Sequence, residues 1–183
     1  MFNRIPTLTT SRLTLRPVQP TDAEDLYNFY SVDEITKFYD LITYNSISET
    51  QNIIDLWLER ESKKIGCRWA ILINDQDERP IGTCGFHNQS KDNSRIEIGY
   101  ELHPRYWNNG YATEACRELI KFGFNELKIH RIEAYIDPKH NISRNVLYKL
   151  GMTTEGVLRD YFYERGKYVD AEILSLLNPI KNK

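Results

Sequence analysis

The hydrophobic period of the chain changes abruptly across residues 103–115, which read HPRYWNNGYATEA. Before this segment, apolar and polar residues alternate over Arg95–Leu102, which predicts a strand. After it, apolar or small residues recur every three or four positions over Tyr111–Asn125, which predicts a helix with a small inner face. Alternation returns over Arg131–Ile136. A strand, a glycine-containing turn, a helix and a strand in this order predict a parallel crossover unit.

Four further stretches have the alternation or the turn signals of strands, at residues 12–18, 69–73, 81–86 and 161–177. The last is interrupted by Arg165 and Gly166, which predict a hairpin turn. Helix starts are predicted by capping boxes, in which a Ser or Thr precedes a Glu by three positions, at Thr21 with Glu24 and Ser46 with Glu49. The first of these helices should run through Tyr30, and a short helix at residues 143–150 should end at Gly151.

These elements predict a single domain over residues 1–183 in the α+β class, with the three layers of an α/β arrangement. The sheet is expected to be mixed and mostly antiparallel, with six to seven strands and helices on both faces. A length of 183 residues suits one domain with its own core. No repeat, low-complexity tract or Pro/Gly/Ser-rich linker divides the sequence.

Charge and cysteine content argue against several classes of protein. The 24 Lys and Arg residues nearly balance the 26 Asp and Glu residues, so neither nucleic acid nor an anionic membrane is an expected partner. Cys67, Cys84 and Cys116 are odd in number and far apart, which favours reduced thiols. Neither the start of the sequence nor any apolar run predicts a signal peptide or a membrane span. A cytoplasmic location is therefore expected.

The turn before Tyr111 can be interpreted as a phosphate site. The first turn of a helix leaves N–H groups without partners in the helix, and the helix dipole adds partial positive charge there. Gly110 would let the backbone approach a ligand, and Asn108 and Asn109 tolerate turn conformations and can donate hydrogen bonds. A lone glycine before a helix is more often only a tight turn, and the local pattern alone favours that interpretation.

Other catalytic and binding signatures are missing from the sequence. Gly151 and Gly156 have the spacing of the Walker glycines, but Val157 and Leu158 stand where Lys and Ser or Thr are required. The four histidines show no metal-ligand spacing, so no metal site is predicted. The G-x-S-x-G turn of serine hydrolases is absent as well.

Six segments, in order along residues 10–177, together resemble a known family, although each alone is weak. They are TSRLTLRP at 10–17, DAE at 22–24, EIGY at 97–100, YWNNGYATEA at 106–115, SRNVLYKLG at 143–151 and EGVLRDYFYERGKYVD at 155–170. They resemble the GNAT (Gcn5-related) N-acetyltransferases, and within them the RimJ/RimL-like branch that acetylates ribosomal-protein N-termini. The resemblance implies a GNAT-type fold and acetyl-CoA as the acetyl donor.

The resemblance also implies which residues bind acetyl-CoA. The pantetheine arm would pair with the backbone of Tyr100, Glu101 and Leu102, the pyrophosphate would lie on Trp107, Asn108, Asn109, Gly110, Tyr111 and Ala112, and the last helix would contribute His140, Asn141 and Ser143. Two of these cofactor-binding positions depart from the pattern of the branch. Asn108 stands where a Gly is frequent, and His140 stands where an Asn usually precedes the last helix. Either His140 or the displaced Asn141 could therefore contact the cofactor.

The implied reaction needs a base that removes a proton from the acceptor amine and an acid that protonates the leaving thiolate. Ser143 is the expected acid, because a serine has this role in the RimL-like branch and Leu147 replaces the tyrosine of many relatives. Glu97 and Glu101 alternate onto one strand face and are alternative bases. A bulge at residues 100–102, which the family has, would expose an N–H for the developing oxyanion. Equally, Ser143 could only cap its helix, and the glutamates could form a solvated or salt-bridged face.

The acceptor is expected to lie against residues 38–46, the helix that contains Trp57, and the hairpin at residues 161–163. The favoured acceptor is a protein N-terminal α-amine of the ribosomal-protein type, and a small amine such as an aminoglycoside, a polyamine or an amino acid is the alternative. A different class also stays open, in which the chain is a catalytically silent module that binds acyl-CoA. Pairing through a sheet edge would allow a homodimer.

Overall fold

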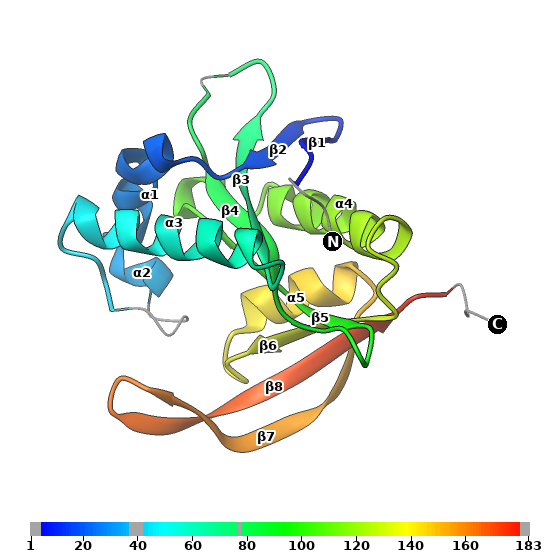
Figure 1. The fold of residues 1–183 in the computed structure, drawn as a ribbon. Helices are drawn as coiled ribbons and strands as arrows, with labels where there is room; N and C mark the ends of the chain where they lie inside the picture. The colour runs from blue at the N-terminus through cyan, green and yellow to red at the C-terminus, as the bar shows by residue number, and fades with distance from the viewer. Residues whose placement is uncertain (1–4, 37–41, 77, 180–183) are drawn as a thin grey trace.

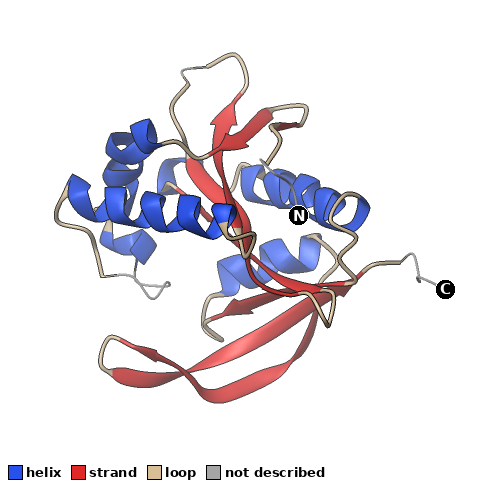
Figure 2. Cartoon of the chain, in the orientation of Figure 1, coloured by secondary structure: helices blue, strands red, loops and turns tan. Residues whose placement is uncertain are grey.

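The structure is a computed structural model that describes residues 5–36, 42–76 and 78–179. Its strands are β1 Leu8–Thr9, β2 Leu13–Pro17, β3 Cys67–Ile73, β4 Gly82–Ser90, β5 Arg95–Leu102, β6 Arg131–Ile136, β7 Thr153–Glu164 and β8 Lys167–Leu177. Its helices are α1 Ala23–Tyr30, α2 Asp33–Thr36, α3 Ile47–Ser62, α4 Tyr111–Asn125 and α5 Asn141–Lys149. The strands form one sheet in the order β1-β2-β3-β4-β5-β6-β8-β7 (Figure 1), and helices lie on both of its faces (Figure 2).

The predicted α+β class and the mixed, mostly antiparallel sheet are confirmed, but the sheet has eight strands rather than six to seven. The additional strand is β1, which pairs with β2 through only two residues, Leu8 and Thr9. A strand this short has no hydrophobic period to recognise. The structure also extends β3, β4 and β7 beyond their expected ends, because hydrogen bonding to neighbouring strands stabilises residues that the local pattern does not mark.

The predicted crossover is confirmed by the β5–α4–β6 unit, whose strands pair in parallel. Helix α4 begins and ends at the predicted residues. Its small inner face lies close to the sheet: a β-carbon at Gly123 would be 3.0 Å from Cζ of Phe86 and 3.1 Å from Cδ1 of Ile132. A larger residue at this position would therefore push the helix away from the strands that it covers.

The two expected capping boxes have different outcomes. The box at the start of α3 is confirmed. The prediction of a capping box at Thr21 and Glu24 is wrong. A 3₁₀ turn begins at Pro20, and the carboxylate of Asp22 accepts a hydrogen bond from the N–H of Gln19 at 2.8 Å. Proline is preorganised for the first helical position, so the turn begins one residue before Thr21. Helix α1 then continues to its predicted end.

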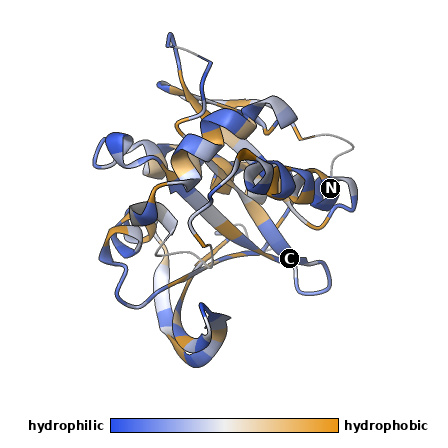
Figure 3. Ribbon diagram, turned by 90° about the vertical axis from the view of Figure 1, so that its left-hand side faces the viewer, coloured by the Kyte–Doolittle hydropathy of each residue, from blue (hydrophilic) through white to orange (hydrophobic). Residues whose placement is uncertain are grey.

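Strand β3 has hydrophobic side chains on both faces, which gives the sheet a core on each side. Trp69 and Ile71 belong to a larger cluster under α4, and Ala70 and Leu72 belong to a smaller cluster under α1 and α3. All three cysteines are free and lie in the larger cluster. The loop between β3 and β4, at the top of Figure 3, is hydrophilic by contrast. In the described ranges, no helix combines the length and apolar composition needed to cross a membrane.

Strands β5 and β6 separate halfway along β5, and this opening positions the site. Their parallel pairing ends at Glu97 and Glu133, while β5 continues to Leu102 and β6 continues alongside β8. The bulge expected at residues 100–102 is not found in the β4–β5 ladder, whose register is regular there and shifts only beyond His87. The edge of β5 is therefore opened by divergence of the two strands rather than by a bulge against β4.

Candidate active site

Two cavities meet at the end of β5, and Tyr100 and Glu101 line both of them. The first has a volume of about 230 Å³ and lies between the β5–α4 loop and α5; we call it the helix-side cavity. The second has a volume of about 520 Å³ and is bounded by α3, strands β3 to β6 and the β7–β8 hairpin; we call it the hairpin-side cavity. Groups bound in the two cavities would meet beside the open edge of β5 at these two residues.

The β5–α4 loop presents free N–H groups to the helix-side cavity. Gly110 caps α4 in the left-handed conformation with a φ of 79°, and Asn108 is left-handed as well with a φ of 61°. The first hydrogen bond within the helix runs from the N–H of Glu114 to the carbonyl of Gly110 at 3.0 Å. The N–H groups of the preceding turn, which lines the cavity, thus have no partner within the helix. Such a turn fits an anionic group.

Arg12 and Glu114 hold this loop from the outside. The guanidinium of Arg12 donates to the carbonyl of Asn109 at 3.1 Å and to the Glu114 carboxylate at 2.7 Å, and it lies 4.6 Å from the ring centroid of Tyr111. Burial raises the pKa of Glu114, but hydrogen bonds from Thr10 and Arg12 outweigh it and the net direction is down. The Asn109 side chain turns back to the carbonyl of Trp107 at 2.9 Å, so it does not line the cavity.

Helix α5 forms the opposite wall of the helix-side cavity. It begins two residues earlier than predicted, with His140 as its N-cap. His140 and Ser143 are buried and line the cavity, whereas Asn141 is exposed and accepts a hydrogen bond from Arg144. The hydroxyl of Tyr100 donates to the carbonyl of Ser143 at 3.2 Å, which ties β5 to α5. Two residues were expected to take the place of the family's asparagine before this helix. His140 lines the cavity, and Asn141 does not.

The other hydroxyl on α5, that of Tyr148, lies away from the cavity. It is 3.1 Å from Oγ1 of Thr154, and the residue is 49% exposed. Leu147 is fully buried in the larger core cluster. Gly151 follows the helix in the left-handed conformation, as predicted, with a φ of 86°. Ser143 is therefore the α5 hydroxyl residue that lines the helix-side cavity.

Glu101 is the centre of a buried polar network between the two cavities. Its carboxylate accepts hydrogen bonds from the hydroxyls of Tyr30 and Thr83 and forms an ion pair with Arg68. The Arg68 guanidinium also lies 5.0 Å from the ring centroid of Trp57. Burial lowers the pKa of Arg68, but the negative charge of Glu101 outweighs it and the pKa is raised overall. The network joins α1, β3, β4 and β5, and both of its charges are compensated.

Glu97 lies further along the same face, and it lines the hairpin-side cavity together with Gly99 and Glu101, as the alternation predicts. Its Oε2 accepts a hydrogen bond from Nδ2 of Asn88 at 3.0 Å and lies 3.3 Å from Nε2 of His87.

Several polar residues of the hairpin-side cavity were not predicted as site residues from the sequence, among them Tyr30, Arg68 and His87. Tyr30 stands in a segment interpreted only as a helix, and Arg68 directly precedes the strand predicted at residues 69–73. His87 follows directly on the strand predicted at residues 81–86, and continuing that alternation would have placed it on the cavity face. The approach of these side chains to Glu97 and Glu101 depends on strand register, which no local spacing signals.

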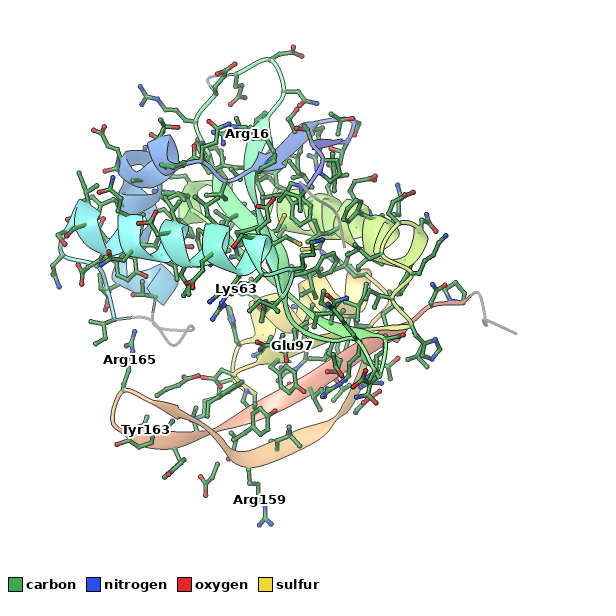
Figure 4. All side chains as sticks on the ribbon, in the orientation of Figure 1. Arg16, Lys63, Glu97, Arg159, Tyr163 and Arg165 are labelled. Carbon is green, nitrogen blue, oxygen red and sulfur yellow. The ribbon has the colours of Figure 1, made fainter. Side chains whose placement is uncertain are left out.

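Aromatic side chains of the β7–β8 hairpin pack against β6 beside the hairpin-side cavity, and Phe162 is the one that lines it. Tyr161 stacks on Tyr135 of β6 with ring centroids 5.4 Å apart, and Phe162 packs edge-on against both. At the tip, Arg165 donates to the carbonyl of Thr36 at 3.0 Å, so the hairpin reaches the helical part of the molecule (Figure 4). Residues 38–41 of the expected acceptor segment lie outside the described residues.

Comparison with known proteins gives three findings. The family description "Acetyltransferase (GNAT) domain" matches residues 12–153. The uncharacterized N-acetyltransferase YoaA of Bacillus subtilis is 37% identical over 174 residues, which cover 95% of this chain and 98% of YoaA. The [ribosomal protein uS5]-alanine N-acetyltransferase of Escherichia coli is 26% identical, covering 94% of this chain and 91% of that one.

Among solved structures, the fold is similar to that of RimL, a ribosomal L7/L12 α-N-protein acetyltransferase in complex with coenzyme A. The TM-score is 0.84 at 17% sequence identity, with 94% of this chain and 98% of that chain covered. At this identity the likeness concerns the fold.

Proposed function

The chain belongs to the acetyltransferase (GNAT) domain family and is an N-acetyltransferase, and on that premise we propose that it acetylates the N-terminal α-amine of a protein, of the ribosomal-protein type. The observation that carries the proposal is the meeting of two cavities at Tyr100 and Glu101. A donor in one cavity and an amine in the other would meet at the open edge of β5, which suits direct transfer. The relative that acts on ribosomal protein uS5 supports an α-amine as acceptor.

The helix-side cavity fits acetyl-CoA, which supplies an activated acetyl thioester when bound. The open edge of β5 at Tyr100, Glu101 and Leu102 can pair with an extended amide chain such as pantetheine. The loop at residues 107–112 would hold the pyrophosphate through its free N–H groups. His140 and Ser143 line the opposite wall. Asn109 and Asn141 point elsewhere, so only their backbone would take part.

We assign the acid to Ser143 and a structural task to Glu101. The hydroxyl of Ser143 would protonate the leaving thiolate from α5. The Glu101 carboxylate is already engaged by hydrogen bonds from two hydroxyls and by the ion pair with Arg68, so it is not available to an acceptor amine. Instead, Glu101 would keep the end of β5 rigid. Backbone N–H groups on the open edge of β5 would stabilise the developing oxyanion.

The hairpin-side cavity suits a positively charged chain end. Besides the paired Glu101, carboxylates from three strands and one loop line it, namely those of Glu97, Asp137, Glu164 and Asp170. Phe162 of the hairpin and Tyr135 of β6 are aromatic side chains in its wall. An ammonium group would be attracted to the carboxylates, and the first side chains of a peptide would pack on these two rings. A protein N-terminus combines both features.

The test is acetyl-CoA turnover with hexapeptides, read by thiol release and by the mass of the product. A peptide with a free N-terminal Ala or Ser should gain one acetyl group on its α-amine. The matched control is the same peptide with a blocked N-terminus and an internal Lys, which should stay unmodified. If only spermidine or an aminoglycoside is acetylated, the acceptor is a small amine instead of a protein N-terminus. Calorimetric binding of coenzyme A without turnover on any amine would indicate a silent binding module.

A further inference from the structure

His87 lies on the floor of the hairpin-side cavity, directly opposite Glu97 in the β4–β5 ladder. Its Nε2 is 3.3 Å from Oε2 of Glu97, and Asn88 donates to the same oxygen at 3.0 Å. The side chains are 33% exposed for His87 and 19% exposed for Glu97. The imidazole is thus accessible from the cavity, while the carboxylate beside it is held in place.

A glycine clears the space into which the His87 ring extends. Gly99 stands two residues after Glu97 on β5, and Gly85 is its partner in the ladder. A β-carbon at Gly99 would lie 3.1 Å from Cε1 and 3.7 Å from Nδ1 of His87, and 3.5 Å from Nη1 of Arg68. The edge of the imidazole that carries Nδ1 therefore lies over Gly99, next to the residue where the two cavities meet.

We infer that His87 is the base that removes the proton from the acceptor amine, with Glu97 as its positioning residue. When Nε2–H faces Glu97, the lone pair of the neutral ring is on Nδ1, the atom over Gly99. Glu97 also stabilises the imidazolium that forms when Nδ1 takes up the proton, as a carboxylate does in other histidine-based sites. The inference rests on the proposed function, since it needs an amine in the hairpin-side cavity.

The step balances in protons and electrons. The acceptor ammonium gives one proton to Nδ1 of His87, and its freed lone pair forms the C–N bond to the acetyl carbon. The C–S bond breaks with its electron pair on sulfur, and the thiolate takes the second proton of the nitrogen through Ser143. His87 then releases its proton to solvent. The products are the N-acetyl amide, the free thiol of coenzyme A and one proton.

The charges around His87 are compatible with this role. Cationic Arg68 is adjacent, but its charge is compensated by Glu101. The other charged groups that line the cavity are Arg60 from α3, Asp137 after β6, Glu164 from β7 and Asp170 from β8. Glu97 is the carboxylate in contact with the ring. Glu97 therefore balances the positive charge that the imidazole gains when it takes up the proton.

The test compares His87→Gln and Glu97→Gln with the wild-type protein, using the Ala-starting hexapeptide across a range of pH. His87→Gln should lower kcat/KM at neutral pH by at least about 100-fold. The loss should shrink as the pH rises, because the free amine then exists without a base. Glu97→Gln should change the rate in the same direction by less. The coenzyme A affinity of both variants should stay at the wild-type value, which also shows that they fold.

The matched control is His130→Gln, which removes an exposed imidazole outside both cavities and should leave the rate unchanged. If the wild type acetylates the peptide and His87→Gln has the same rate and pH profile, His87 is not the base, and the proposed function still holds. No turnover by the wild type with any amine would overturn the proposed function, and the base with it. Imidazole ¹⁵N shifts add a readout without turnover: a neutral ring with its proton on Nδ1 would contradict the inference.

Discussion

The two cavities that meet at β5 are built in different ways. The helix-side cavity comes from two short stretches of chain, residues 100–113 and 140–149. The hairpin-side cavity combines side chains from elements spread between residues 30 and 170. A loop conformation and a helix start can be specified by neighbouring residues, whereas a cavity of the second kind depends on strand register and packing. The comparison predicts that substitutions in the buried Glu101–Arg68 network of the hairpin side affect the whole fold, and that those on the helix side have local effects.

The largest effect is expected for Arg68→Met on the hairpin side. Removing the guanidinium leaves Glu101 buried without its cation, so the free energy of unfolding should fall by about 3–5 kcal/mol. Urea denaturation measures this change. The double variant Arg68→Met with Glu101→Leu removes both charges and should recover most of the stability. A single variant as stable as the wild type would show that the network is not what joins α1 to the sheet.

The fold could be predicted best where a hydrophobic period is long and uninterrupted. Helix α4 and strands β5 and β6 lie at their predicted residues, since each has a clear period. The start of α1 could not be predicted from its capping pattern, because Pro20 begins an earlier turn and Arg16, on a strand, takes the carboxylate of Asp22. The two-residue β1 offered no pattern at all.

The same difference holds for the candidate site. The loop with Asn108 and Gly110 was found from local composition, and its left-handed residues are as expected. Alternation found Glu97 and Glu101, but their partners come from other strands and from α1. His87 meets Glu97 only because the β4–β5 register sets them opposite each other. The catalytic and cofactor-binding roles of these residues stay predictions until they are measured.

The next effect in size is expected for Ser143→Ala on the helix side. Without its hydroxyl the leaving thiolate loses its proton donor, so kcat should fall by at least about 100-fold. The dissociation constant of coenzyme A should stay unchanged. Tyr148→Phe is the matched control, because its hydroxyl contacts Thr154 instead of the cavity. A larger loss in Tyr148→Phe than in Ser143→Ala would assign the acid to the tyrosine.

A smaller and local effect is expected for Gly110→Ala on the helix side. The left-handed conformation costs an L-residue about 1–2 kcal/mol, and the added β-carbon would meet Nη2 of Arg12 at an ordinary 3.5 Å. The loop would relax, and coenzyme A should bind roughly 10-fold more weakly by calorimetry. Gly166→Ala is the control, since Gly166 is also left-handed but lies at the hairpin tip. Equal losses of coenzyme A affinity in the two variants would contradict a local role for the loop.

The smallest effect is expected at the base of the hairpin, where Glu155 accepts hydrogen bonds from Arg131 at 2.7 Å and from Ser175 at 2.6 Å. These bonds lower the pKa of Glu155 from 4.5 to about 2. Because the folded-state pKa is the lower one, the contribution to stability is complete above pH 4.5 and is lost as the pH falls towards 2. The side chain is 42% exposed, so Glu155→Gln should reduce the unfolding free energy by less than about 1 kcal/mol at pH 7.

The pH dependence of the stability of Glu155→Gln tests whether the charged Glu155 carboxylate stabilises the base of the hairpin. The difference in unfolding free energy between the wild type and Glu155→Gln should narrow steadily below pH 4.5 and vanish near pH 2. At neutral pH the acceptor KM should rise while coenzyme A affinity stays constant, because β7 lines only the hairpin-side cavity. A stability difference that is the same at all pH values would mean that the carboxylate charge contributes nothing. A parallel loss of coenzyme A affinity would mean that the two cavities are coupled through β6 and α5.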